Sequence, residues 1–353
     1  MSSLPSSLSQ HTLWEEDKNP IWLGSSLTLQ RNLSRYKFPS KLSESEMKTL
    51  STSLAEALQK NPALKSPIFF PAEKISPLDK EFIFEHFLCL ESFQNADAGQ
   101  GFLLDETGRF LARLNLKNHL ALQMIDTSGD INAAWSKLLG LEMEIGKTLE
   151  YAFSPKFGYL TSDPTQCGTA LQALLYLHIP ALHHTGQLHE VLGKQKEEDV
   201  MTMGLEGALD DLVGDFLILK NRYTLGVTEE GVLHSLQTTA LKLMAAEKAL
   251  RSHLKETGNA EMKDFVSRAY GLLVHSYQLQ TKEALNALSA LKLGLDLGWI
   301  SGISNQVINT LFFKCRRAHL AQLLHEKTLD THDMPHKRAE FIHKALQGMT
   351  LQE

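Results

Sequence analysis

Apolar residues near the start of the chain recur at helical spacing. Leu50, Leu54 and Leu58 lie four residues apart, and the S-x-x-E spacing of Ser43 and Glu46 ahead of them is typical of a capping box. These positions predict a helix that begins near residue 43 and buries one face. The region 1–20 has no such pattern, and we expect it to be frayed.

Strand signals are clearest over 101–125. Two apolar runs there flank a turn at 105–108 that ends in Gly108, and alternation of apolar and other residues returns over 120–124. Runs of this kind around a short glycine-containing turn are typical of a hairpin. We expect helices over 130–150 and 167–179 and a further strand over 216–219.

The pattern changes after Gly226. Thr228, followed by Glu229 and Glu230, suits a helix start because acidic side chains are favoured at the positive end of a helix. Helical spacing then continues over 228–255, 261–278, 281–296, 304–325 and 336–347. We therefore predict an α+β domain over 1–253 and an all-helical domain over 254–353.

Composition and charge exclude several classes of protein. Of the 353 residues, 43% are hydrophobic, and the net charge of −6 provides no basic surface for nucleic acid. No apolar run reaches the roughly 18 residues of a membrane span, and the first ten residues lack the features of a signal peptide. We expect a cytoplasmic protein that binds neither nucleic acid nor membrane. Three cysteines, Cys89, Cys167 and Cys315, are too far apart to predict a zinc knuckle or a disulfide framework.

Two motifs invite a chemical interpretation without supporting it. The segment 140–148 has five residues between its glycines where a phosphate-binding loop needs four, and it lies in a helical pattern. His178, His183, His184 and His189 crowd together, but metal ligands on one helix face need spacing near four with a carboxylate or cysteine to complete the shell, and Pro180 interrupts this segment. We expect these histidines to line a loop or cleft, and we predict no metal site.

Several segments, in order along the chain, resemble one family. The run 158–169 reads GYLTSDPTQCGT, similar to the family's GYLTSCPTNxGT, and 178–182 reads HIPAL against HLPAL. The stretches 25–33, 221–226, 268–273 and 291–298 match further family segments. On these residues the chain resembles the bacterial protein-arginine kinases, which belong to the ATP:guanido phosphotransferases. The resemblance implies a phosphagen-kinase-like antiparallel sheet flanked by helices, followed by a helical dimerisation domain.

That family transfers the γ-phosphate of ATP to arginine side chains of proteins, and this chain departs from it where phosphates would bind. The positions of five family arginines are occupied by Ser26, Thr28, Ala121, Gln172 and Met203. The resemblance places nucleotide-binding positions also at Gly24, Ser25, Leu27, His86 and Ala208, the last of which replaces a carboxylate.

At other positions this chain either retains the family's residue or replaces it. Arg31, Asn115 and His119 are retained, while Leu116 replaces a substrate-binding carboxylate and Asp163 replaces the family's active-site cysteine. In the segment that resembles the family's phosphoarginine-sensing motif, only Lys337 and Arg338 still offer positive charge. Residual anion binding at these two residues is one expectation, and a solvated helix start is the other.

One arginine at a phosphoryl-transfer transition state can be worth roughly 10³–10⁵ in rate, so the loss of five predicts an inactive pseudokinase. The alternative is a divergent active kinase in which Arg31 or Arg35 substitutes for a lost arginine. As the resemblance implies, we expect a homodimer formed through the helical domain, a small zinc-binding activator as partner and a link to a Clp-type protease. We expect no cofactor, with Mg-ATP bound only if kinase function persists.

Overall fold

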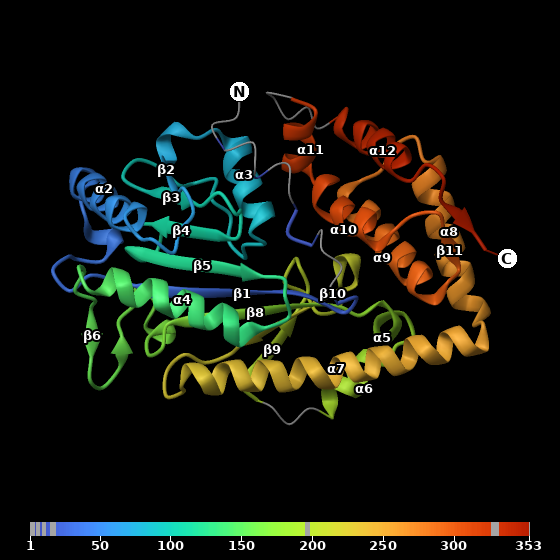
Figure 1. Ribbon diagram of the computed structural model, residues 1–353, viewed down its shortest axis with the longest axis horizontal. Helices are drawn as coiled ribbons and strands as arrows, with labels where there is room; N and C mark the ends of the chain where they lie inside the picture. The colour runs from blue at the N-terminus through green and yellow to red at the C-terminus, as the bar shows by residue number, and fades with distance from the viewer. Residues whose placement is uncertain are drawn as a thin grey trace.

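The computed structural model describes residues 4, 8, 12–14, 19–194, 198–325 and 332–352. An antiparallel sheet forms the centre of the molecule, with the strand order β2-β3-β4-β5-β1-β8-β10-β9 (Figure 1). In chain order these strands are β1 (Trp22–Arg31), β2 (Ile68–Pro71), β3 (Gly101–Leu104), β4 (Phe110–Leu114), β5 (Leu120–Asp126), β8 (Leu171–His178), β9 (Val200–Met203) and β10 (Phe216–Asn221). The short strands β6 (Phe153–Ser154) and β7 (Gly158–Tyr159) form a separate hairpin.

One face of the sheet is covered by three helices: α2 (Glu44–Gln59), α4 (Ile131–Gly146) and the first half of α7 (Glu229–Thr257). Leu50, Leu54 and Leu58 of α2 pack here with Leu27 and Leu29 of β1. The predicted capping box is confirmed, because Ser43 and Glu46 each bond the other's backbone N–H. The segment 140–148 lies in and just after α4, so its rejection as a phosphate loop is also confirmed.

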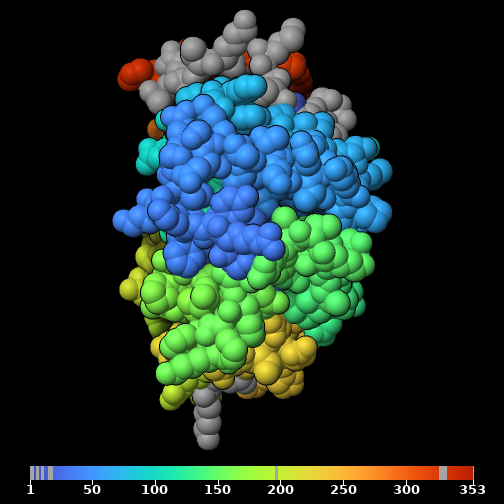
Figure 2. Space-filling model, turned by 90° about the vertical axis from the view of Figure 1, so that its left-hand side faces the viewer, coloured from blue at the N-terminus to red at the C-terminus, as the bar shows by residue number. Residues whose placement is uncertain are grey.

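Seen from the end of the sheet at which α2 lies, residues of the α2 region pack directly against α4 and the β6–β7 hairpin (Figure 2). Two backbone hydrogen bonds join these regions, from Ser34 N–H to Glu150 O at 3.0 Å and from Ala152 N–H to Asn32 O at 2.7 Å. The segment after β1 is therefore fixed to the segment after α4.

The other face is covered by α3 (Pro77–His86) and by the helices that follow α7. Those helices are α8 (Ala260–His275), α9 (Thr281–Leu297), α10 (Asn305–Lys314), α11 (Arg317–Leu323) and α12 (Met334–Ala345). Beside them, β11 (Ile300–Ser301) pairs with β12 (Thr350–Leu351). In Figure 1, α7 runs along the sheet and reaches the helical part. It ends at Gly258, which adopts a left-handed φ of 57° as helix-terminating glycines commonly do.

Two predicted helices are wrong in type or extent. The segment predicted as a helix over 167–179 is largely strand β8, which lies in the middle of the sheet between β1 and β10. A strand buried on both faces has a continuous apolar sequence, which spacing alone cannot distinguish from a buried helix. The helix predicted over 304–325 is broken at Arg316, whose backbone is extended, into α10 and α11.

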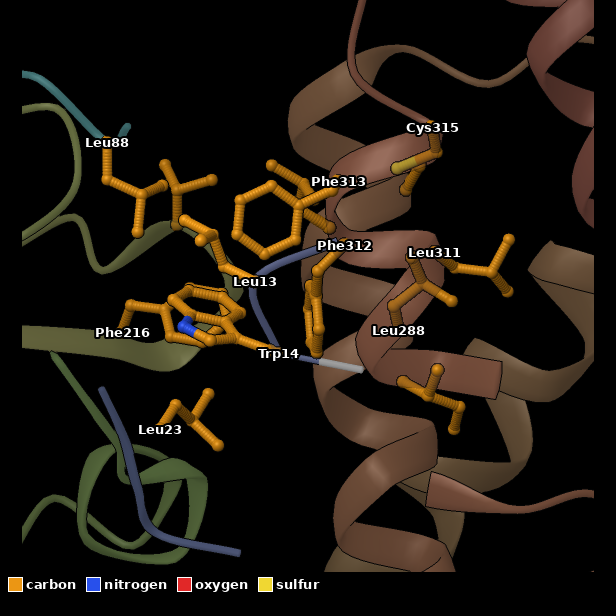
Figure 3. Packing of buried hydrophobic residues seen from close by; sticks show 14 of the residues in the cluster. Leu13, Trp14, Leu23, Leu88, Phe216, Leu288, Leu311, Phe312, Phe313 and Cys315 are labelled. Atoms are coloured by element: carbon orange, nitrogen blue, oxygen red, sulfur yellow. The ribbon is translucent and has the colours of Figure 1, made fainter. Parts of the chain in front are cut away.

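The expectation of a frayed start is wrong where the structure describes it. Leu8, Leu13 and Trp14 are buried, whereas 1–3, 5–7, 9–11 and 15–18 lie outside the described residues. The Trp14 ring lies between Phe216 of β10 and the Phe312 and Phe313 rings of α10 (Figure 3), with centroid distances of 5.0, 6.4 and 4.8 Å respectively. This short segment therefore joins the sheet to the helical part.

The core is continuous across the predicted domain boundary between 253 and 254. Residues of β10, α9 and α10 belong to one buried cluster, so the division into 1–253 and 254–353 stays a prediction. Within the described ranges, none of the helices combines the length and apolar character needed to cross a membrane.

Two short helices, α5 (Pro180–His184) and α6 (Leu188–Gly193), follow β8 at the end of the sheet nearest the helical part. The 3₁₀ turns are η1 (Pro39–Lys41), η2 (Ala72–Lys74), η3 (Pro164–Gln166) and η4 (Val213–Asp215).

Candidate functional site

The five positions without arginine lie on one face of the sheet, on the four strands β5, β1, β8 and β9. Residues directly opposite each other in antiparallel strands share a face, as do alternate residues of one strand. Thr28 lies opposite Gln172, and Ser26 is on the same face two residues earlier. Ala121 is on this face because its partner in β1 is Gln30, two residues after Thr28. Met203 is on it because its partner in β10 is Ile218, which is on the same face. We call this the phosphate face; it is the face covered by α3 and the C-terminal helices.

Neutral side chains fill the centre of the phosphate face. Ser26 is 1% exposed, and its hydroxyl accepts a hydrogen bond from the Gln123 amide at 2.9 Å. The same amide donates to Phe87 O at 2.9 Å, and the Tyr176 hydroxyl donates to Leu88 O at 3.2 Å. The segment 87–89 is thereby held against the sheet. Burial raises the pKa of the adjacent Cys89 thiol to about 11, so this group is also neutral near pH 7.

Three of the predicted nucleotide-binding positions have structural contacts instead. A Cβ on Gly24 would come within 2.9 Å of Asp126 O, so the close pairing of β1 with β5 requires glycine there. The Ser25 hydroxyl accepts a hydrogen bond from the Trp22 indole at 3.1 Å, and Leu27 is fully buried on the opposite face.

His86, another predicted nucleotide-binding position, is buried at the end of α3. Its Nε2 donates to Gly108 O at 3.0 Å, because a carbonyl oxygen can only accept. Burial lowers the pKa of His86 to about 3, with a smaller contribution from nearby His319. The ring is therefore neutral near pH 7 and offers no positive charge to a nucleotide.

The loop after β9 forms a tight turn. Gly204 N–H donates to Ala208 O at 3.1 Å, and Gly207 N–H donates to Gly204 O at 3.0 Å. Met203 is half-buried against the core of the phosphate face, while Ala208 and Glu206 are exposed. The loop thus contributes an apolar side chain to this face and a carboxylate to its surroundings.

Arg31 is retained in sequence but points away from the phosphate face. It lies opposite Leu120, on the face covered by α4, and it is 2% exposed. Its Nε forms an ion pair with Glu142 at 2.6 Å, and its guanidinium lies 3.5 Å from the centroid of the Tyr159 ring. Arg35 is exposed and pairs with Glu150 at 3.4 Å. In this arrangement neither arginine is placed to substitute for a lost phosphate-binding arginine, so the structure does not favour that alternative.

Asn115 and His119 hold neighbouring loops together. Asn115 has a left-handed φ of 56°, and its amide donates to Met47 O at 2.9 Å and Gly99 O at 3.0 Å. His119 Nδ1 accepts from Leu33 N–H at 3.0 Å, so its Nε2 carries the proton and donates to Lys37 O at 2.9 Å. Burial lowers the pKa of His119. Both residues therefore have structural roles that explain their presence without a nucleotide.

Leu116 and Asp163 lie on the two loops beside the phosphate face. Leu116 is half-buried and packs on the core. Asp163 is exposed, and its Oδ1 accepts hydrogen bonds from the Thr165 amide at 3.0 Å and the Thr165 hydroxyl at 2.7 Å. These bonds lower the pKa of Asp163, which keeps its carboxylate ionised. The Ser162 hydroxyl joins the loops by donating to Lys117 O at 2.6 Å.

Two cations on the phosphate face were missed from the sequence. Arg113 of β4 lies directly opposite Ala121, and Lys220 of β10 lies directly opposite Leu174, which itself faces Ser26. The Arg113 Nε atom is buried without a hydrogen-bond partner among the described residues. Burial lowers the pKa of Lys220. Both residues could have been found from the sequence by extending the alternation of faces from the five replaced positions to the neighbouring strands.

Arg338 has a structural role in place of the expected anion site. It is 2% exposed, and its guanidinium donates to Cys315 O at 2.6 Å and to Leu279 O at 2.7 Å. Burial lowers its pKa. Neighbouring Lys337 is half-buried on α12. Because Arg338 ties α12 to the end of α10 and to the start of α9, anion binding by this pair of residues is not favoured.

Comparison with known proteins agrees with this arrangement. The family described as ATP:guanido phosphotransferase, C-terminal catalytic domain, matches residues 47–250, and the protein-arginine kinase McsB C-terminal domain matches residues 259–353. A protein-arginine kinase of Chlamydia pneumoniae is 34% identical over 338 residues, covering 94% of this chain and 93% of its own. That of Bacillus subtilis is 28% identical over 314 residues, covering 88% and 86%.

Solved structures show the fold. A taurocyamine kinase of Schistosoma mansoni matches with a TM-score of 0.58 at 21% identity, over 70% of this chain and 36% of that chain. A lombricine kinase matches with a TM-score of 0.57 at 18% identity, over 71% and 73%. The sheet and its helices are therefore those of the phosphagen kinases, and this chain belongs to the McsB-type protein-arginine kinase family of ATP:guanido phosphotransferases.

Proposed function

We propose that this chain is a protein-arginine kinase homologue that no longer transfers phosphate and acts as a regulator or scaffold. One observation carries the proposal. All five positions at which the family has phosphate-binding arginines lie together on the phosphate face, and none of them holds a charged side chain. Because the five positions share one location, their replacement supports a change of the whole phosphate-binding site. Five unrelated surface substitutions would be scattered over the molecule.

The size of the expected loss supports inactivity. A single transition-state arginine in phosphoryl transfer is worth roughly 10³–10⁵ in rate, and such contributions are not additive when residues act as a unit. At Ser26, the space that an arginine would need is filled by the hydrogen-bonded Gln123 and the segment 87–89. The carboxylates of Asp163 and Glu206 add negative charge beside the site, which disfavours bound phosphates.

A divergent active kinase is the second candidate, and Arg113 and Lys220 favour it. Both lie on the phosphate face, and Arg113 is directly opposite the replaced Ala121. Their charges could receive phosphates from a different direction than the family's arginines do. Mg-ATP would be the cofactor in that case only.

The experiment is to incubate the full-length protein with Mg-ATP and an arginine-rich protein, and to detect phosphoarginine by ³¹P NMR and mass spectrometry. The Bacillus subtilis protein-arginine kinase serves as the positive control. We expect no phosphoarginine, with or without a small zinc-binding activator. The control variant is Lys147→Ala, at an exposed position just after α4. If phosphoarginine forms in the wild type and in this control but not in Arg113→Ala, the chain is a divergent kinase instead.

Calorimetric titration with Mg-ATP separates loss of chemistry from loss of binding. Weak or absent binding agrees with a scaffold, while micromolar binding that depends on Lys220 supports the second candidate.

The proposal also includes a homodimer formed through the helical part, and a regulated partner in a Clp-type protease system. Sedimentation that shows only monomer over a wide concentration range would remove the dimer from it.

A further inference from the structure

Two of the crowded histidines meet a carboxylate that is distant in sequence. His183 and His184 end helix α5, and Asp215 ends the turn η4 just before β10. His183 Nδ1 lies 2.6 Å from Asp215 Oδ1, and His184 Nε2 lies 2.9 Å from the same oxygen. One donor atom from each of the three residues lies within 4.8 Å of the others. Of the other two histidines, His178 is fully buried and its Nε2 contacts the Ser289 hydroxyl at 2.8 Å, while His189 is largely exposed.

We propose that His183, His184 and Asp215 form a binding site for a divalent transition-metal ion, with Zn²⁺ as the best fit. Two imidazole nitrogens and one carboxylate oxygen are a common zinc ligand set, and a water molecule completes the tetrahedron. Zinc bonds of about 2.0–2.1 Å place neighbouring ligand atoms about 3.3 Å apart. The two nitrogen–oxygen distances, now 2.6 and 2.9 Å, therefore need to lengthen by less than about 1 Å to admit the ion.

The carboxylate is held in place for this role. The Ser289 hydroxyl, on α9, donates to Asp215 Oδ2 and leaves Oδ1 directed at the two histidines. The Asp215 backbone is fixed as well, because its N–H donates to Leu212 O at 2.9 Å and its carbonyl accepts from Ile179 N–H at 3.0 Å. Partners of this kind around the ligands orient them and are a regular part of protein metal sites.

Access and position also suit a bound ion. The side chains of His183 and His184 are 31% and 28% exposed, whereas that of Asp215 is 4% exposed. One side of the site is therefore open for the ion and its water. The His184 ring lies 4.1 Å from the Phe265 ring of α8, and Ser289 belongs to α9. A metal here would tie α5 and the end of the sheet to the helical part.

The competing description is a hydrogen-bonded cluster in which both histidines donate to Asp215 and no metal binds. The two descriptions differ in a measurable way, because the metal must replace the protons that now lie between the donor atoms. None of the three residues is one of the nucleotide-binding positions, so the inference does not depend on whether the chain is an active kinase.

The test uses the full-length protein after treatment with EDTA and dialysis. Titration with Co²⁺, followed by visible absorption, reports four-coordinate binding, and calorimetry with Zn²⁺ gives the stoichiometry. We expect one ion per chain and an intense cobalt spectrum. The His183→Ala/His184→Ala variant should bind at least about 100-fold more weakly. The control variant His189→Ala/His234→Ala, at two exposed positions, should bind as the wild type does.

Circular dichroism shows whether each variant is folded, and the single variants His183→Gln and His184→Gln repeat the comparison if the double variant is not. Zn²⁺ should also raise the melting temperature of the wild type and leave that of the histidine variants unchanged. Absence of saturable one-to-one binding in the wild type would overturn the proposal. Equal affinity in the wild type and the folded histidine variants would do the same.

Discussion

Two arginines four positions apart show how burial decides a residue's role. Arg31 is buried on β1 and pairs with the buried Glu142 of α4, while Arg35 is exposed and pairs with the exposed Glu150. A buried charge that loses its partner is left without water around it, which costs free energy. An exposed charge that loses its partner is hydrated by solvent. The two pairs therefore differ in their energetic importance although both are ion pairs in the same segment.

Arg31→Ala should lower the free energy of unfolding by about 3–5 kcal/mol, because it leaves Glu142 buried and unpaired. Arg35→Ala should lower it by less than about 1 kcal/mol. Urea unfolding followed by circular dichroism measures both values. Similar losses in the two variants would contradict the assignment of Arg31 to the fold.

At the scale of single residues, the resemblance named the replaced positions but did not place them on one face, because the strand that carries Gln172 was predicted as a helix. Ser26, Thr28 and Gln172 meet because strand alternation brings matched positions together. Arg113, the neighbour of Ala121, can be found this way only if the alternation is carried across the hairpin turn that sets the register of β4. Asp215 could not be assigned to His183, since only the packing of α5 against η4 makes them neighbours.

At the scale of elements, signals carried by periodicity succeeded where one face is exposed and failed where both are buried. The helix α2 was predicted correctly, because its polar side marks its period. Strand β8 was predicted as a helix, since its alanine and leucine residues favour helices and the sheet around it decides otherwise.

The contact between α3 and α11 shows a second feature that only the tertiary structure defines. The buried Glu85 carboxylate accepts hydrogen bonds from Ala318 N–H at 3.2 Å and from His319 Nδ1 at 2.9 Å, at the start of α11. His86 lies beside it, with its ring stacked 5.8 Å from that of His319. Burial lowers the pKa of both histidines, and the bond from His319 helps to lower the pKa of Glu85 despite its burial.

Acid should weaken this contact. In the unfolded chain a histidine gains a proton below about pH 6.5, but His86 in the folded protein resists protonation down to a pKa of about 3. The free energy of unfolding should therefore fall as the pH falls from 6.5 towards 3, by at most about 1.4 kcal/mol per pH unit for this group. His86→Gln should reduce that slope between pH 7 and pH 5 in denaturant unfolding.

His234→Gln, on an exposed position of α7, is the matched control and should keep the wild-type slope. An unchanged slope in the His86 variant would show that other groups govern the acid response.

At the scale of the whole molecule, the described residues form one continuous core between the sheet and the C-terminal helices. Trp14 is central to it, since its ring contacts both Phe216 of the sheet and Phe313 of α10. Removal of a large buried aromatic side chain costs about 3–5 kcal/mol. Trp14→Ala should therefore lower the melting temperature in calorimetry while the protein still unfolds in a single transition.

Tyr277→Ala, which truncates an exposed aromatic ring (73% exposed), should leave the melting temperature unchanged. Two separate transitions in the wild-type protein would contradict a shared core. A variant with Trp14→Phe should recover most of the loss, because the smaller ring can still fill much of the space between the phenylalanines.

The place of Trp14 also has a consequence for biosynthesis. A ribosome produces position 14 long before positions 312 and 313, so the aromatic ring must wait for nearly the entire chain before its partners exist. Domains usually fold as units, the earlier one first, while the chain is still being made. In this protein the sheet can pair its strands early, but the first segment finds its final place only after α10 has left the ribosome, so this part of the core forms late.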